Sequence, residues 1–265
     1  MLITSLQNSR IKQVVALRDR KERTRSGLMR VEGFEELSLA LASGAQPTAV
    51  FFCPDLIRSP HPQALLDQIE QRGADLIEVT QPVFEKMAYR EGPDGWLATF
   101  PVIETRLEAL HLRSDPFVIV AEGVEKPGNL GAILRTADAA GVDAVIAAAP
   151  LTDWGNPNIV RASKGALFSV PVTAAPTDQT IAWLREHNIQ IVAATPQATK
   201  VYTQADLRGS VAIAVGEEKY GLSQTWLDAA DVQVQIPMFG KVNSLNVSIA
   251  TALLSYEVVR QRRQN

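Results

Sequence analysis

The sequence predicts an α/β protein with two domains, the second built on a parallel sheet that helices cover on both faces. The chain has 265 residues, enough for about two domains of ordinary size. Short, nearly continuous apolar segments alternate with amphipathic segments, a pattern typical of buried parallel strands. Around residues 101–114 a more polar stretch interrupts the alternation. We interpret this stretch as a linker between domains at 1–100 and 115–265.

Strands and helices alternate along the N-terminal domain. Apolar residues at helical spacing that stop at a glycine, as at Gly44 and Gly73, indicate where helices end. We expect helices at about 5–24, 34–44, 64–73 and 81–88, and strands at 28–33, 49–53, 75–79 and 95–100. This part of the chain therefore forms a small α/β unit.

The alternation is stronger in the C-terminal domain. We expect strands at 117–123, 144–149, 170–174, 189–195, 211–218 and 232–238, and helices at 129–141, 156–167, 178–188 and 244–263. Ligands of open α/β sheets gather outside the carboxyl ends of the strands. The loops that follow "FVIVA", "VAIAV" and "VQVQI" are therefore the places where a site is expected.

Composition excludes several classes of protein. Cys53 is the single cysteine and three histidines are present, which excludes an internal disulfide and a thiolate zinc cluster. No apolar run approaches the ~18 residues of a membrane-spanning helix. The first residues lack the apolar core of a signal peptide. We expect a soluble, cytoplasmic protein that contacts no membrane and holds no metal.

Charge is unevenly distributed along the chain. The formal net charge of −3 argues against a nucleic-acid partner. Residues 1–30, however, contain eight basic and two acidic residues, and the last residues, "VVRQRRQN", are also basic. Such a segment is either a solvated helix face or a surface that binds RNA.

The first of the three loops reads "EGVEKPGNLGAILR". Its glycines lack the spacing of a phosphate-binding or dinucleotide-binding loop, which argues against an NAD-dependent dehydrogenase. Asn129 stands where a helix N-cap is expected, and Arg135 lies six residues further on, roughly on the opposite side of the helix. Taken alone, this segment is explained by a cap and a solvent-facing charge.

The other two loops also have structural explanations. In "VGEEKYGLS", the adjacent Glu217 and Glu218 point in different directions in most backbones, so at most one is expected to act in a reaction. "IPMFGKVNSLNVSIATALL" begins a helix, which a serine cap and a buried apolar face would explain. That apolar face is expected to consist of Leu245, Ile249, Leu253 and Tyr256.

Taken together, the three loops resemble the SpoU (TrmH-like) branch of the SPOUT class of RNA ribose 2′-O-methyltransferases. The first motif of that family matches Asn129, Gly131, Arg135 and Thr136. The second motif matches Gly216, Glu218, Gly221 and Leu222, with Lys219 and Tyr220 where the family usually has a small residue. The third and most specific motif matches Ile236, Pro237, Met238, Gly240, Ser244, Leu245, Asn246, Val247, Ser248 and Ala250. The segment "MRVEGFEELSLAL" resembles, more loosely, the start of the RNA-binding domain similar to ribosomal protein L30e that many of these enzymes carry.

The resemblance implies a fold and a cofactor. It implies a deep trefoil knot at the C-terminal end, a homodimer formed through that domain, and S-adenosyl-L-methionine as cofactor. The expected cofactor-binding residues are Gly216, Glu217, Ile236, Met238, Ser244 and Leu245. The expected catalytic residues are Arg135, Asn129, Glu218, Ser244 and Asn246.

The implied reaction is methyl transfer to a ribose 2′-hydroxyl of structured RNA. Arg135 is a poor base because a guanidinium has a pKa above about 12, so we assign it an electrostatic role; Glu218 is an alternative proton acceptor. An N-terminal domain similar to L30e favours the 23S rRNA of the large subunit. The alternatives are a tRNA ribose 2′-O-methyltransferase and an inactive RNA-binding or ribosome-assembly protein.

Overall fold

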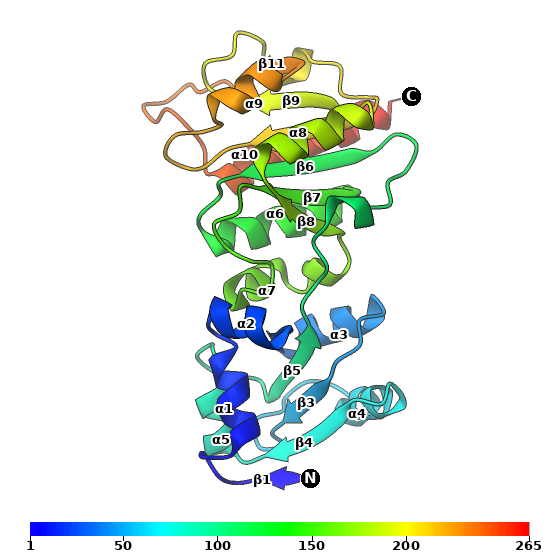
Figure 1. The fold of residues 1–265 in the computed structure, drawn as a ribbon, viewed down its shortest axis with the longest axis vertical. Coiled ribbons are helices and arrows are strands. Elements are labelled where there is room, and N and C mark those ends of the chain that lie inside the picture. Colours follow the sequence, from blue (N-terminus) through cyan, green and yellow to red (C-terminus); the bar gives the residue numbers. More distant parts are fainter. Residues whose placement is uncertain (265) are drawn as a thin grey trace. The chain divides into compact units, whose positions relative to one another are not determined.

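The computed structural model describes residues 1–264, which divide into two compact units (Figure 1). The N-terminal unit consists of Met1–Ile103 and Asp153–Ser169. The C-terminal unit consists of Glu104–Thr152 and the chain from Val170 onward. The break between 103 and 104 falls within the expected linker. Residues 153–169, by contrast, pack with the N-terminal unit although they lie far beyond that break in the sequence.

The N-terminal unit contains a five-stranded mixed sheet in the order β1-β4-β3-β5-β2. β5 runs antiparallel to both of its neighbours, and the other pairings are parallel. Its strands are β1 (Leu2–Ile3), β2 (Leu28–Glu32), β3 (Ala49–Phe52), β4 (Asp75–Val79) and β5 (Trp96–Pro101). Its helices are α1 (Ser9–Ala16), α2 (Arg20–Ser26), α3 (Phe34–Ala42), α4 (Pro62–Gln71), α5 (Gln81–Met87) and α7 (Pro157–Ser163), with a 3₁₀ turn at Ala166–Phe168.

The expected first helix is two helices in the structure. The first helix ends at Ala16, and Asp19 caps the second, because its carboxylate accepts a hydrogen bond of 2.7 Å from the backbone N–H of Lys21. An aspartate is neutral to unfavourable inside a helix and favourable at an N-cap, where it satisfies one of the free N–H groups. The prediction of one continuous helix over 5–24 was therefore wrong.

The basic segment at 1–30 is largely engaged with other parts of the same unit. Arg23 is 2% exposed and donates from Nε to Asp153 at 2.9 Å. Arg18 donates to three backbone carbonyls at the end of α5, and Arg10 pairs with Asp75 at 3.0 Å. Much of the excess positive charge therefore stabilises this unit.

The C-terminal unit contains six parallel strands in the order β11-β9-β10-β6-β7-β8. These are β6 (Phe117–Glu122), β7 (Ala144–Ala148), β8 (Val172–Ala175), β9 (Gln190–Ala194), β10 (Val211–Val215) and β11 (Val232–Val234). The helices are α6 (Pro127–Ala140), α8 (Thr177–Glu186), α9 (Gln224–Ala229) and α10 (Val247–Arg262), with 3₁₀ turns at Leu107–Ala109 and Tyr202–Gln204. Every residue of β6, β7 and β10 is buried, as expected for strands covered on both faces.

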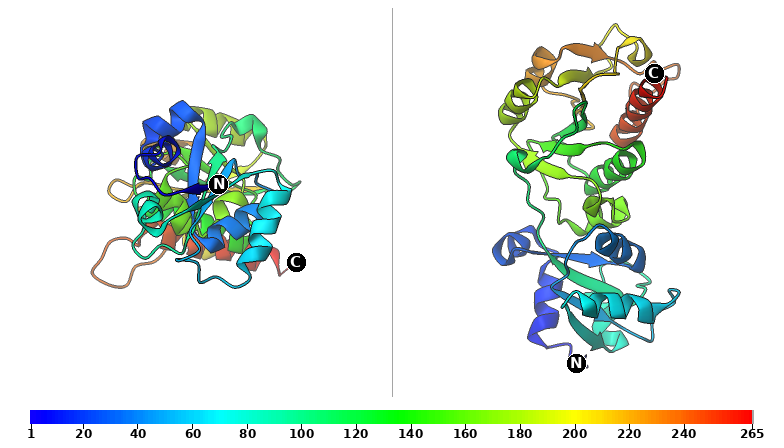
Figure 2. Two further views of the ribbon diagram at one scale, coloured as in Figure 1. Left: turned by 90° about the horizontal axis from the view of Figure 1, so that it is seen from below. Right: turned by 90° about the vertical axis from the view of Figure 1, so that its right-hand side faces the viewer.

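Helices cover both faces of this sheet (Figure 2). α6 and α10 pack side by side on one face, and α8 and α9 lie together on the other. The side chains of Trp183 and Trp226 are buried in the core between α8, α9 and the sheet. All six strands point the same way, so their carboxyl ends meet at one edge, where the loops after β6, β9, β10 and β11 begin.

Two helix starts differ from expectation. α6 begins at Pro127 after Lys126, so Asn129 lies within its first turn and is not the cap. α10 begins at Val247, and Asn246, not Ser244, caps it by accepting a 2.9 Å hydrogen bond from the N–H of Ser248. The side chains of Asn129 and Ser244, which the sequence had explained as helix caps, are therefore available for other contacts.

The apolar face expected to bury α10 is exposed in the single chain. Leu245, Ile249, Leu253 and Tyr256 are 36%, 53%, 39% and 51% exposed. α10 packs on α6 and the sheet through another face, which includes Val247, Thr251, Leu254 and Val258. The helical spacing was correct, but the exposed stripe is not part of the core of the single chain.

Candidate active site

A pocket of about 460 Å³ opens at the carboxyl edge of the six-stranded sheet. The loops after β9, β10 and β11 and the first residues of α10 line it. Pockets for small ligands commonly have volumes of about 300–1,000 Å³. All six residues expected to bind a cofactor lie around it: Gly216, Glu217, Ile236, Met238, Ser244 and Leu245.

Gly216 allows the loop after β10 to fold back on itself. A Cβ at this position would lie 2.1 Å from the backbone carbon of Gly221, far inside van der Waals contact. Gly221 has a φ of +74°, and its N–H donates to the carbonyl of Glu217 at 3.0 Å. Glycine is needed at both positions, at the first for close approach and at the second for the left-handed turn. The spacing of this motif is therefore a backbone requirement.

The pocket combines apolar walls with free backbone donors. Leu222 and Val234 are buried side chains of the wall. Within residues 1–264, the backbone N–H groups of Ile236, Met238 and Leu245 have no hydrogen-bond acceptor. An apolar slot with N–H donors suits a flat heteroaromatic group such as adenine, because the faces bury apolar area and the edge nitrogens accept hydrogen bonds. The residues present therefore fit the cofactor that the motifs imply.

Three polar side chains from three separate loops are joined by hydrogen bonds. The amide Nδ2 of Asn129, on α6, donates to Oε1 of Glu218, in the loop after β10. The Oδ1 atom of the same Asn129 accepts from Nδ2 of Asn246, at the start of α10, at 3.2 Å. Asn246 in turn accepts from the hydroxyl of Ser248 at 2.6 Å. We call Asn129, Glu218 and Asn246 the amide–carboxylate cluster.

This cluster fixes the orientation of both amide groups and of one carboxylate oxygen. Asn129 donates from its amide nitrogen to Glu218 and accepts at its amide oxygen from Asn246. These two partners identify which atom of the Asn129 amide is nitrogen and which is oxygen. Glu218 is exposed and also lines the pocket, which connects the cluster with the pocket wall. Residues 117 positions apart in sequence, Asn129 and Asn246, are thus brought into contact.

Arg135 is not part of this arrangement within one chain. It is exposed on α6, six residues after Asn129, which corresponds to about 9 Å along a helix axis. Its side chain makes no hydrogen bond or ion pair with any residue in the part of the chain that the structure describes. It does not line the pocket either. Of the five expected catalytic residues, the structure joins three, places Ser244 in the pocket wall and leaves Arg135 apart.

Sequence reasoning missed two contributors to this edge of the sheet. The loop after β9 supplies Thr195, Pro196 and Gln197 to the pocket wall. β9 pairs with both β10 and β11, so its carboxyl end must lie beside theirs, and an apolar strand followed by "TPQ" was a usable signal. Glu122, at the end of β6, accepts hydrogen bonds of 2.7 Å from both the N–H and the hydroxyl of Ser223, and so ties the first loop to the second.

The fold and the site together define an α/β enzyme that uses a small-molecule cofactor, with its polar cluster at the carboxyl edge of a parallel sheet. Residues 116–256 match the model of the SpoU rRNA Methylase family, and residues 8–98 match an MRM3-like substrate binding domain. The chain belongs to the SpoU rRNA methylase family, and the resemblance inferred from its three motifs is confirmed.

Relatives agree with this assignment along the whole chain. A tRNA/rRNA methyltransferase of Synechocystis sp., described as uncharacterized, is 32% identical over 98% of this chain and 94% of its own length. The 23S rRNA (guanosine-2′-O-)-methyltransferase RlmB of Pasteurella multocida is 35% identical over 76% of this chain and 84% of its own length. The solved structure of an AdoMet-bound rRNA methyltransferase from Sinorhizobium meliloti has a TM-score of 0.90 at 29% identity, and the match covers 98% of this chain and 97% of that chain.

Proposed function

We propose that this chain transfers a methyl group from S-adenosyl-L-methionine to a ribose 2′-hydroxyl of structured RNA, with large-subunit (23S) rRNA as the substrate. The observation that carries the proposal is the amide–carboxylate cluster held beside an apolar pocket with free backbone donors. The relative from Pasteurella multocida is named for this reaction on 23S rRNA, and the neighbour from Sinorhizobium meliloti was solved with the same cofactor.

Each residue has a role in this proposal. When bound, the cofactor supplies an electrophilic methyl carbon on a positively charged sulfur. Gly216, Ile236 and Leu245 hold it by backbone contacts, with Glu217, Met238 and Ser244 beside it. The attacking 2′-oxygen must lose its proton, and Arg135 stabilises the negative charge that develops on this oxygen. Asn129 and Asn246 orient Glu218, the carboxylate placed to accept the proton.

A homodimer formed through the C-terminal unit belongs to the same proposal. The exposed apolar stripe of Leu245, Ile249, Leu253 and Tyr256 is unusual for the surface of a monomer and suits an interface between two copies. The position of Arg135 outside the pocket of its own chain supports an active site that a second chain completes. Ile249→Glu should then yield a monomer in analytical ultracentrifugation, and an unchanged oligomeric state would reject this interface.

The remaining assignments follow from the RNA substrate. We assign 1–100 to RNA binding, 101–114 to the linker and 115–265 to methyl transfer, with the family's trefoil knot at the C-terminal end. An rRNA substrate places the enzyme in the cytoplasm. Within residues 1–264, none of the helices has both the length and the hydropathy needed to cross a lipid bilayer.

The test is methyl transfer from labelled S-adenosyl-L-methionine to separate pools of rRNA and tRNA that lack the modification, followed by mapping of ribose methylation. Label in large-subunit rRNA is the expected result. Label in tRNA alone would replace the substrate with tRNA. Label in neither pool, from a chain that binds RNA, would support a non-enzymatic RNA-binding protein instead.

A further inference from the structure

A second polar pocket lies within the N-terminal unit, and the reaction proposed above does not use it. β2, the turn after α5, and α7 line it, with Arg30, Glu32, Tyr89, Arg90 and Arg161 as its polar or aromatic residues. Its volume is about 10 Å³, which is room for one water molecule or one oxygen atom of a larger group. We call it the arginine pocket.

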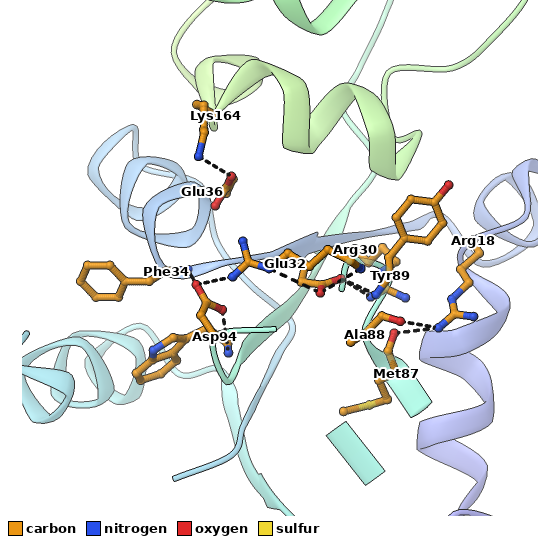
Figure 3. A network of polar contacts seen from close by, with 12 residues as sticks. Arg18, Arg30, Glu32, Phe34, Glu36, Met87, Ala88, Tyr89, Asp94 and Lys164 are labelled. Carbon is orange, nitrogen blue, oxygen red and sulfur yellow. Dashed lines mark hydrogen bonds and ion pairs between the residues drawn. The ribbon is translucent and has the colours of Figure 1, made fainter. Parts of the chain in front are cut away.

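Arg30 has the most deeply buried polar side chain of the arginine pocket and lies beside Glu32 (Figure 3). Its side chain is 1% exposed, and its Nη2 atom donates to Oε2 of Glu32 at 2.8 Å. Its other two nitrogens, Nε and Nη1, are buried and have no hydrogen-bond partner among residues 1–264. Buried N–H groups of a charged side chain are rarely left unpaired, because they have lost the water that would solvate them. Two such groups on one guanidinium indicate that something outside the chain satisfies them.

The carboxylate in this pocket is already engaged. Glu32 accepts from Arg30 and also from the backbone N–H of Tyr89 at 2.7 Å. Arg90 pairs with Asp94 at 2.7 Å and, through Nε, with Glu32 at 3.9 Å; this Nε atom is buried and makes no hydrogen bond among the described residues. Burial lowers the pKa of Arg30 to about 10, so it stays protonated at neutral pH. The groups that remain available in the pocket are therefore donors and positive charges.

The wall of the arginine pocket that belongs to α7 is firmly attached to the rest of the unit. Nδ2 of Asn158 donates to the hydroxyl of Tyr89 at 3.1 Å. Gly155, just before α7, packs closely on β2, because a Cβ added there would lie 3.1 Å from the Cβ of Met29. Arg161 is exposed in the last turn of α7 and makes no hydrogen bond or ion pair within the described part of the chain. It is thus an exposed cation at the edge of the pocket, without a partner among the described residues.

We propose that the arginine pocket binds one phosphate of the RNA substrate, with one phosphate oxygen inserted between Arg30 and Arg90 and a second oxygen held by Arg161. The inference rests on the proposed function, because it takes RNA as the ligand. The volume admits one oxygen and excludes a nucleobase, so the contact reads the backbone and not the sequence. Guanidinium groups suit this task because their parallel N–H groups match two oxygens of a phosphate.

The experiment compares two exposed arginines in the last turn of a helix. Arg161→Ala removes the exposed cation at the edge of the arginine pocket, and Arg185→Ala removes a matched cation from α8. Binding of an unmodified 23S rRNA transcript to the full chain is measured over a range of salt concentrations. We expect Arg161→Ala to weaken binding about tenfold at low salt and to reduce the slope of log K against log salt by about 0.7–0.9, the value for one phosphate contact. Arg185→Ala should leave both quantities unchanged.

A second variant tests the interior of the pocket. Arg30→Lys keeps a charge beside Glu32 but removes the fork of N–H groups, so it should weaken RNA binding by a similar factor while S-adenosyl-L-methionine still binds the C-terminal unit normally. If Arg30→Lys fails to fold, Arg161→Ala decides alone. Wild-type affinity and salt slope in Arg161→Ala would overturn the phosphate site and leave the methyltransferase proposal standing. A wild-type chain that binds cofactor but no RNA would overturn both.

Discussion

The two pockets of this protein are built by opposite means. The pocket of the C-terminal unit is shaped by backbone: glycines allow a close turn, residues with free peptide N–H groups line an apolar slot, and uncharged amides hold the carboxylate of Glu218. The arginine pocket is shaped by long charged side chains that emerge from a buried strand, with Arg30 and Glu32 two residues apart on β2. The first kind of site depends on residue spacing, and the second depends on the balance of buried charges.

This difference determines which substitutions should disrupt each pocket. A backbone-built site is disrupted by adding atoms, whereas a charge-built site is disrupted by removing one partner of a pair. Neutral amides tolerate partial exposure, and the amide–carboxylate cluster is exposed. A buried guanidinium that loses its carboxylate partner, by contrast, destabilises the folded chain. The following variants test this contrast, from the largest expected effect to the smallest.

Arg135→Ala should reduce methyl transfer by at least about a thousandfold, because it removes the charge that stabilises the developing alkoxide. Cofactor affinity should stay within about twofold of wild type, since Arg135 does not line the pocket. Single-turnover methylation and calorimetric titration with S-adenosyl-L-methionine separate the two effects. Arg135→Lys keeps the charge but not the planar fork and should retain part of the rate. An active Ala variant would remove Arg135 from the mechanism.

Glu32→Ala should lower the free energy of unfolding by about 3–5 kcal/mol, because it leaves Arg30 buried without a counter-charge. It also removes the acceptor for the backbone N–H of Tyr89. Urea unfolding of the full chain measures the loss. The matched control is Glu104→Ala, which breaks an ion pair with Arg106 on an exposed surface and should change nothing measurable. Equal stability of the two variants would contradict a charge-built pocket.

Gly216→Ala should lower the free energy of unfolding by about 1–3 kcal/mol and weaken cofactor binding at least tenfold. The added Cβ meets the backbone of Gly221 and Leu222, which cannot move aside as a flexible side chain would. Gly209→Ala is the control, because a Cβ there meets nothing within 4 Å. Thermal unfolding and cofactor titration of both variants provide the comparison. A Gly216→Ala chain with normal affinity would show that the close turn is not needed for the slot.

The difference between the two pockets also explains which features could be predicted from the sequence. The strands of the C-terminal unit were predicted because buried parallel strands are continuously apolar. The pocket residues were expected because the three loops resemble the motifs of the SpoU family, in which the glycine spacing records backbone geometry. The exposure of Ile249 and Leu253 was not predictable, because α10 has apolar residues on more than one face and periodicity does not say which face a core covers.

The arginine pocket was beyond sequence reasoning for a different reason. Arg30 stands in an otherwise apolar strand, and the wall opposite it comes from α7, about 130 residues later in the chain. The segment Asp153–Ser169 packs with the N-terminal unit through tertiary contacts that no local pattern records. Charge counts at 1–30 suggested an RNA-binding surface, but they could not separate structural arginines such as Arg23 from those available to a ligand.

The smallest expected effect concerns another buried charge of the N-terminal unit, Glu36, which is 2% exposed and has Lys164 at 4.0 Å (Figure 3). Burial raises the pKa of Glu36 above its ordinary value of 4.5. The folded chain then binds more protons than the unfolded chain, so stability falls as pH rises above about 4.5 and levels off beyond the raised pKa.

Glu36→Gln should therefore raise the Tm at pH 8 by about 2 °C and leave it unchanged at pH 4. Glu35→Gln, on the exposed neighbour that also pairs with Lys164, should show no such pH dependence in calorimetry. An equal shift in the Tm of both variants at both pH values would show that the effect comes from the lost pairing with Lys164 and not from the burial of Glu36.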